Sequence, residues 1–215
     1  MSFDCERDFY AVTDWHRGAY LGGEAMPDHL GTFFERVGVP GSVADVGCGP
    51  ALVPFELSPE YPDTEFHCYD VAPSVVEANR ERAAEADLDN LNFSVAGLPD
   101  LGVDREFDLV YCMATLYFVE DAERAVTELY ELVAPGGTLV CNYPNRYTRA
   151  WVNEDTDDQR REAFELVGRG ENLLSYERIR ELLGRTPRSY WSAVGASDAD
   201  YARRSSPAVY VTKPE

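Results

Sequence analysis

The chain has 215 residues, which is enough for one domain, or for one domain with a small appendage. Its 39 acidic side chains outnumber 18 arginines and the single Lys213, and the resulting net charge of −20 disfavours binding to nucleic acid or to anionic membranes. So acidic a surface predicts a salt-adapted protein, because dissolved ions screen the repulsion between its charges, while an ordinary acidic protein is the alternative.

The apolar runs, the first residues and the cysteines of the sequence indicate the kind of protein and its compartment. No apolar run approaches the ~18 residues of a membrane helix. The first ten residues carry Asp4, Glu6 and Asp8, which argues against a secretory signal. The five cysteines are isolated and odd in number, so we expect free thiols in a reducing cytoplasm, with no disulfide framework and no metal site.

Segments with strand and helix character alternate along the chain. The polar and aromatic residues 1–25 are expected to form one or two short helices over the sheet edge. Hydrophobic periodicity then predicts helices at 27–37, 51–57, 73–86 and 120–133. Strands are predicted at 43–46, 65–69, 91–95, 107–113 and 138–143. This alternation indicates an α/β fold, a three-layer sandwich whose parallel sheet is covered on both faces.

The carboxyl-terminal third is less regular. Residues 144–156 show no clear period, a helix is predicted at 157–167, and Ser175 is expected to cap another helix. Two final strands are predicted at 189–194 and 208–212. Because no repeat or interdomain linker is visible, we expect a single domain over residues 1–215.

The chain is organised around the turn that follows its first predicted strand. Asp45 opens this turn, and Gly47 and Gly49 bring bare backbone to the sheet edge where ligands bind in open α/β sheets. Asp70 ends the next strand, where its carboxylate can accept hydrogen bonds from both ribose hydroxyls of a nucleoside. A dinucleotide site normally adds a third glycine, and Leu52 occupies that position, which weakens the interpretation as a nicotinamide-binding oxidoreductase.

The ordered motifs resemble the class I S-adenosylmethionine-dependent methyltransferases. Residues 45–51 are similar to the first motif of that family, and Asp70 to its ribose-binding acid. Residues 107–110 look like its fourth strand, and residues 132–139 like its Leu-x-Pro-Gly-Gly turn. The resemblance implies seven strands with the last one antiparallel. It covers residues 40–143 in detail, and the remainder of the chain only by strand pattern.

The resemblance also implies a cofactor site for S-adenosylmethionine, with S-adenosylhomocysteine as the product. It assigns cofactor contacts to Asp45, Gly47, Cys48, Gly49, Asp70, Val71, Gly97, Leu98, Cys112 and Met113. Val71 and Leu98 would enclose adenine, and Cys112 and Met113 would line the methionine tail. The acid that often follows the third strand in this family is missing, so a backbone carbonyl of residues 96–98, or Asp100, would have to bind the adenine amino group.

The acceptor side carries weaker signals. Residues 1–25 are predicted to form a cap, residues 144–174 a substrate-side insertion, and residues 175–215 a final helix and strand pair. The side chains expected near the acceptor are Tyr10, Leu116, Tyr143, Arg146 and Trp151. The candidates for a general base are His16, Tyr20 and Tyr117, although packing or an exposed surface position is the alternative for each.

The sequence therefore predicts methyl transfer from S-adenosylmethionine to a small-molecule acceptor in the cytoplasm, without nucleic acid or membrane partners. The sequence leaves the acceptor and the oligomeric state open. Two alternatives are a nicotinamide-dependent oxidoreductase and a non-catalytic S-adenosylmethionine-binding protein on the same fold.

Overall fold

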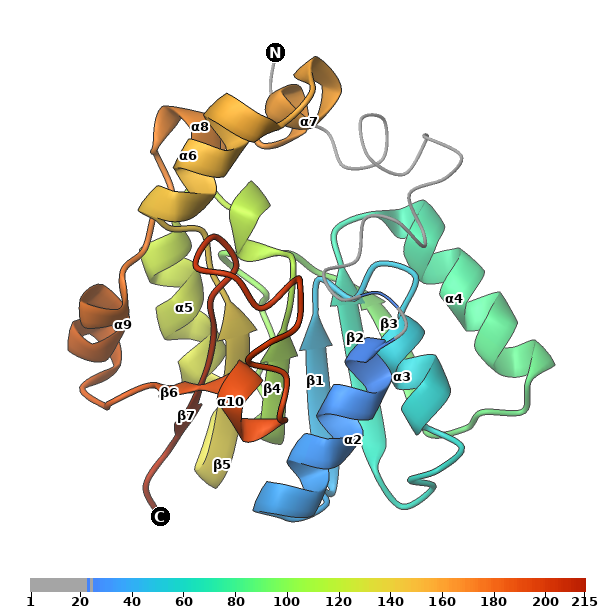
Figure 1. Cartoon of the computed structure of the whole chain (residues 1–215). Coiled ribbons are helices and arrows are strands. Elements are labelled where there is room, and N and C mark those ends of the chain that lie inside the picture. Colours follow the sequence, from blue (N-terminus) through green and yellow to red (C-terminus); the bar gives the residue numbers. More distant parts are fainter. Residues whose placement is uncertain (1–22, 24) are drawn as a thin grey trace.

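A seven-stranded sheet forms the centre of the computed structural model, which describes residue 23 and residues 25–215 (Figure 1). The strands are β1 (Ser42–Val46), β2 (Glu65–Asp70), β3 (Leu91–Val95), β4 (Phe107–Cys112), β5 (Val133–Asn142), β6 (Arg188–Ser189) and β7 (Ala208–Thr212). Their order in the sheet is β3-β2-β1-β4-β5-β7-β6. The first five strands run parallel, and β7 pairs antiparallel with both β5 and β6. The predicted fold class is confirmed.

Helices cover both faces of this sheet. The first set is α2 (Ala25–Val37), α3 (Leu52–Leu57), α4 (Pro73–Glu85) and α10 (Tyr190–Ala193), whose buried side chains share one core. The opposite core belongs to α5 (Ala122–Glu131) and α9 (Tyr176–Leu183). The short helices η2 (Leu116–Phe118), α6 (Arg146–Asp155), α7 (Asp158–Ala163) and α8 (Glu165–Arg169) complete the fold. Figure 1 shows α6, α7 and α8 beyond the tips of the strands.

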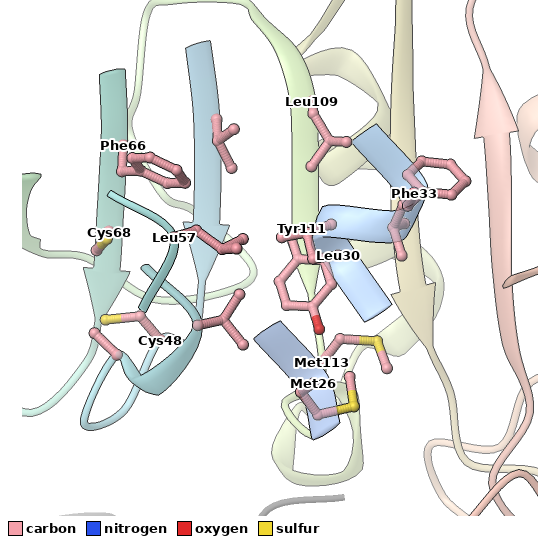
Figure 2. Packing of buried hydrophobic residues seen from close by; sticks show 14 of the residues in the cluster. Met26, Leu30, Phe33, Cys48, Leu57, Phe66, Cys68, Leu109, Tyr111 and Met113 are labelled. Carbon is pink, nitrogen blue, oxygen red and sulfur yellow. The ribbon is translucent and has the colours of Figure 1, made fainter. Parts of the chain in front are cut away.

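Strand alternation divides the apolar side chains between the two cores. On β1, Val43 faces the α2 side, whereas Ala44 and Val46 face the α5 side. On β4, Tyr111 packs with the α2 side (Figure 2). Because a strand covered on both faces must be apolar at successive positions, the central strands read as continuous hydrophobic runs.

Three predicted segments differ in the structure, and local hydrogen bonds explain two of them. Residues 146–155, predicted to be irregular, form α6, because Asn145 and Thr148 make a reciprocal capping box at its start. Most of the segment predicted as a strand at 189–194 is helix α10, because Ser189 accepts a hydrogen bond from the backbone N–H of Ser192. The single helix predicted at 157–167 is divided into α7 and α8, which meet at Phe164.

The Pro135-Gly136-Gly137 segment was expected to precede the fifth strand and lies inside it instead. The register between β4 and β5 shifts between Phe107 and Leu109, so the strand continues through an irregularity. A Cβ on Gly137 would lie 2.7 Å from the carbonyl oxygen of Asp108. Glycine is therefore required by the close approach of two backbones.

Candidate functional site

The loop after β1 is folded against the tip of β2. The backbone N–H groups of Gly47 and Cys48 both donate to the carbonyl of Tyr69, at 2.8 and 3.0 Å. Gly47 has a φ of +76°, and a Cβ there would lie 2.1 Å from Oγ1 of Thr115. Position 47 therefore requires glycine both for its backbone conformation and for the space that Thr115 occupies.

Asp70 fastens the same loop from the end of β2. Its Oδ2 accepts a hydrogen bond from the Gly49 N–H at 2.8 Å, and its Oδ1 accepts one from the Ala72 N–H at 3.0 Å. The side chain is buried. Each carboxylate oxygen has two lone-pair sites, so these bonds leave acceptor capacity for a further donor. Asp70 therefore holds residues 47–49, the glycine loop, in addition to its expected role toward ribose.

Asp45 is a second buried carboxyl group, at the carboxyl end of β1. Burial raises its pKa to about 8, with a smaller contribution from the carboxylate of Asp70. No ion pair to Asp45 occurs in the part of the chain that the structure describes. A buried acid in this setting favours a ligand that brings positive charge, because such a ligand would stabilise the carboxylate.

A narrow pocket opens beside Asp45. Its walls come from α2, β4, α3 and the glycine loop, and consist of Met26, Asp45, Gly47, Cys48, Val53, Tyr111, Met113 and Ala114. Figure 2 shows Met26 and Met113 side by side, with the Tyr111 hydroxyl pointing toward them. Cys112, predicted to line the same wall as Met113, lies in the opposite core, because successive strand residues face opposite sides of the sheet.

Two residues expected near adenine meet at the tips of β2 and β3. Val71 is 51% exposed, and a Cβ on Gly97 would lie 2.8 Å from its Cγ1 atom. Leu98 is partly buried against the core under α5. Asp100, considered as a substitute for the missing adenine-binding acid, forms an ion pair with Arg124. The structure thus gathers Val71 and Gly97 at the expected edge and ties Asp100 to a surface partner.

Three asparagines position the loops of the site, and sequence reasoning missed all three. Asn142, fully buried at the end of β5, accepts from the Ala114 N–H at 2.8 Å and donates to the Tyr117 hydroxyl at 3.1 Å. Asn79 donates to the carbonyl of Gly49 at 2.7 Å. Asn172 donates to three carbonyls in and beside η2, those of Leu116, Tyr117 and Val119. Each of these asparagines acts on a backbone group far away in the sequence, so no local pattern marks its role.

The predicted acceptor-side residues fall into different environments. Leu116 and Tyr143 are buried in the core under α5. Tyr117 is buried in a separate aromatic cluster to which Trp151 also contributes, and burial raises the pKa of its hydroxyl far above the ordinary value. Arg146 is exposed at the start of α6. Tyr10, His16 and Tyr20 lie outside the described residues.

One polar pair near the pocket was not anticipated. His29, one helical turn after the pocket residue Met26, is hydrogen-bonded to the hydroxyl of Tyr201. Trp191 contacts both rings, at centroid distances of 6.3 and 5.5 Å. Burial lowers the pKa of His29. Because 172 positions separate the partners, no local pattern in the sequence could reveal this contact.

The described residues contain neither a candidate membrane-spanning helix nor a candidate metal-binding cluster. None of the helices placed by the structure is both long enough and apolar enough to span a bilayer. Within the same part of the chain, no three His, Cys, Asp or Glu side chains are grouped so that they could hold a metal ion.

Comparisons with known proteins identify a methyltransferase domain in the chain. Residues 43–137 match the family described as methyltransferase domain. The chain is 27% identical over 114 residues to malonyl-(acyl-carrier protein) O-methyltransferase 1 of Ilyobacter polytropus, covering 53% of this chain and 42% of that protein. It is 32% identical over 101 residues to trans-aconitate 2-methyltransferase of Methylobacterium radiotolerans, covering 47% of this chain and 37% of that protein.

The fold also has close counterparts among solved structures. The crystal structure of the plantazolicin methyltransferase BamL, in complex with a triazolic desmethylPZN analog and SAH, superposes with a TM-score of 0.65. The two sequences are 14% identical, and the match covers 89% of this chain and 84% of that one. The chain spans less than half the length of either curated relative above.

Proposed function

We propose that the chain, whose residues 43–137 match the methyltransferase domain family, is a class I S-adenosylmethionine-dependent methyltransferase that methylates a small-molecule acceptor. The observation that carries the proposal is the glycine loop between two buried carboxyl groups, Asp45 and Asp70, at the carboxyl edge of the sheet. A nucleoside with a cationic tail could place its ribose hydroxyls near Asp70 and its positive charge near Asp45.

The residues present fit S-adenosylmethionine. Asp45 offers a buried acid to the cationic amino end of the cofactor, and Met113 and Ala114 offer pocket walls to its methionine part. Val71 and Gly97 form the side assigned to adenine, and we assign the buried carboxyl group of Asp70 to the ribose hydroxyls. S-adenosylmethionine supplies a methyl group already activated by attachment to a sulfonium.

This chain's own contribution is then positioning and the exclusion of water. Thr115 and Asn142 hold the loop after β4, with hydrogen bonds from Thr115 Oγ1 to the Met113 carbonyl and from the Ala114 N–H to Asn142. Met26 and Met113 give the pocket apolar walls. An acceptor held over this pocket would meet apolar walls and a hydrogen-bonded loop, and we infer that transfer needs no dedicated acid or base.

We assign the acceptor side to residues 144–174, which begin where β5 ends. Helices α6 and α8 pack together there, with Trp151, Phe164 and Val167 around Tyr117. An aromatic wall of this size fits a small molecule better than a macromolecule. The two relatives described above are a malonyl-(acyl-carrier protein) O-methyltransferase and a trans-aconitate 2-methyltransferase, whose acceptors bear carboxylates. We assign residues 1–25 to a cap over the site and the protein to the cytoplasm.

Turnover separates an enzyme from a binding protein. The full chain is incubated with S-adenosylmethionine carrying a labelled methyl group and with a panel of small metabolites, and S-adenosylhomocysteine is quantified. We expect acceptor-dependent S-adenosylhomocysteine formation, which disappears in Gly47→Ala. Cofactor binding without product formation for any acceptor would favour the non-catalytic alternative.

A further inference from the structure

Two arginines surround one tyrosine at the start of α6. The guanidinium of Arg146 lies 4.7 Å from the ring centroid of Tyr147, and that of Arg204 lies 5.8 Å from it. Arg146 also donates a hydrogen bond to the Tyr147 hydroxyl at 2.7 Å. All three side chains are exposed, and Tyr147 retains 38% of its surface. Two positive groups and a phenol hydroxyl are therefore presented to solvent together.

The cluster lies at the edge of the sheet that carries the pocket. Arg146 follows the carboxyl end of β5 by four residues, and Arg204 precedes β7, which runs antiparallel, by the same interval. Asn145 donates to the Arg204 carbonyl at 2.8 Å, and Thr148 donates to the Ser205 carbonyl at 2.6 Å. These bonds fix the two segments to each other, so the positions of both arginines are set by the fold.

Within the described part of the chain, the positive charges of the cluster have no acidic side chain beside them. Other arginines of the chain form ion pairs, namely Arg80, Arg105, Arg124, Arg161, Arg169, Arg178 and Arg203. Among the described residues, neither Arg146 nor Arg204 has an acidic side chain within ion-pair distance. Arg203 is paired with Asp200, so the positive charge of its neighbour Arg204 is the one left uncompensated.

The two arginines also affect the acidity of the Tyr147 hydroxyl. The hydrogen bond and the charge of Arg146, together with the charge of Arg204, lower the pKa of the Tyr147 hydroxyl. Arg149, the other arginine of this helix start, donates to the Gly168 carbonyl at 3.1 Å and is thereby turned toward α8. Arg146, Arg204 and Tyr147 remain as one set.

We propose that Arg146, Arg204 and Tyr147 bind a carboxylate group of the methyl acceptor. This inference rests on the proposed methyltransferase function and specifies the acceptor as a small molecule with at least one carboxylate beyond the atom that is methylated. Guanidinium groups match the planar, two-oxygen geometry of a carboxylate, and the phenol hydroxyl supplies a further donor. On a chain with a net charge of −20, a local positive site reduces the repulsion that an anionic acceptor meets.

The test measures carboxylate binding apart from catalysis. The full chain, saturated with S-adenosylhomocysteine, is titrated calorimetrically with trans-aconitate, citrate and malonate, and with the trimethyl ester of trans-aconitate as the uncharged comparison. We expect at least one carboxylate to bind and the ester not to bind. Arg146→Gln and Arg204→Gln should each weaken the binding about tenfold, as loss of a charge-assisted hydrogen bond does.

The control variant is Arg36→Gln, which removes the same charge at an exposed position near the end of α2. This helix end leads into the amino end of β1, whereas the cluster lies at the carboxyl ends of the parallel strands. Its carboxylate affinity should equal that of the wild type. Affinity for S-adenosylhomocysteine is measured in every variant, and failure of the wild type to bind it would refute the proposed function itself. Normal S-adenosylhomocysteine binding with no carboxylate bound, or with equal affinity in all three variants, would refute the carboxylate site alone.

Discussion

Asp45 provides a quantitative test through the pH dependence of stability. Its pKa rises from an ordinary 3.8 to about 8 in the folded chain. Between these two values the folded chain keeps a proton on Asp45 that the unfolded chain has lost. Folding therefore loses stability as pH rises through this interval, whereas the contribution of Asp45 is fully favourable below the ordinary pKa.

The perturbation is Asp45→Asn, which keeps the shape of the side chain and removes its titration. One proton of difference corresponds to ~1.4 kcal/mol of unfolding free energy per pH unit. The variant should gain stability relative to the wild type at about this slope between pH 5 and pH 7 and should reach a constant difference above the folded pKa. Its affinity for S-adenosylmethionine should fall, because the acid that faces the cationic end of the cofactor is gone.

Urea denaturation of both proteins without cofactor, at four pH values from 5 to 8, measures this difference. Asp63→Asn, at an exposed position, controls for the loss of one negative charge. A stability difference between Asp45→Asn and the wild type that does not change with pH would show that Asp45 ionises freely in the folded chain. Asp45 would then not be a buried neutral acid that a cationic ligand could ionise.

Four further results are expected. Gly47→Ala should weaken S-adenosylmethionine binding and lower the melting temperature, measured by calorimetry and thermal denaturation, because its Cβ would overlap Thr115. Asp70→Ala should weaken S-adenosylmethionine affinity by about tenfold to a hundredfold and also lower the melting temperature, since Gly49 loses its acceptor. The melting temperature of the wild type should rise from dilute to molar potassium chloride, and a flat or falling curve would exclude salt adaptation. Deletion of residues 1–22 should leave a folded domain with weak cofactor affinity and no transferase activity, whereas unchanged affinity would remove the cap role.

The sequence predicted the parts of the site that depend on strand ends and glycines. Asp45, Gly47 and Asp70 occupy the tips of neighbouring parallel strands, and a strand tip is visible wherever an apolar run stops at a glycine or an acid. The family resemblance implied the seven strands and the antiparallel last strand. It also assigned Cys112 and Met113 together to the methionine tail, whereas strand alternation places their side chains in opposite cores.

Contacts between distant segments were beyond prediction from the sequence. Asn142 and Asn172 read as ordinary polar residues until the fold brings backbone groups to them from segments 28 and more than 50 positions away. Helix α6 was missed because its start depends on the reciprocal bonds of Asn145 and Thr148, and not on apolar periodicity. The contact between Arg204 and Tyr147 joins two segments that are distant in the sequence, so only the structure reveals it.

Calorimetric titration of the full wild-type chain with S-adenosylhomocysteine and, separately, with NAD distinguishes a methyltransferase from an oxidoreductase. The loop after Gly49 continues into α3 at Leu52 and offers no third glycine to a pyrophosphate, whereas the buried carboxyl group of Asp45 favours a cationic ligand. We expect saturable binding of S-adenosylhomocysteine and no binding of NAD at comparable concentrations. Tight binding of NAD without binding of S-adenosylhomocysteine would contradict the account and move the chain to the oxidoreductases.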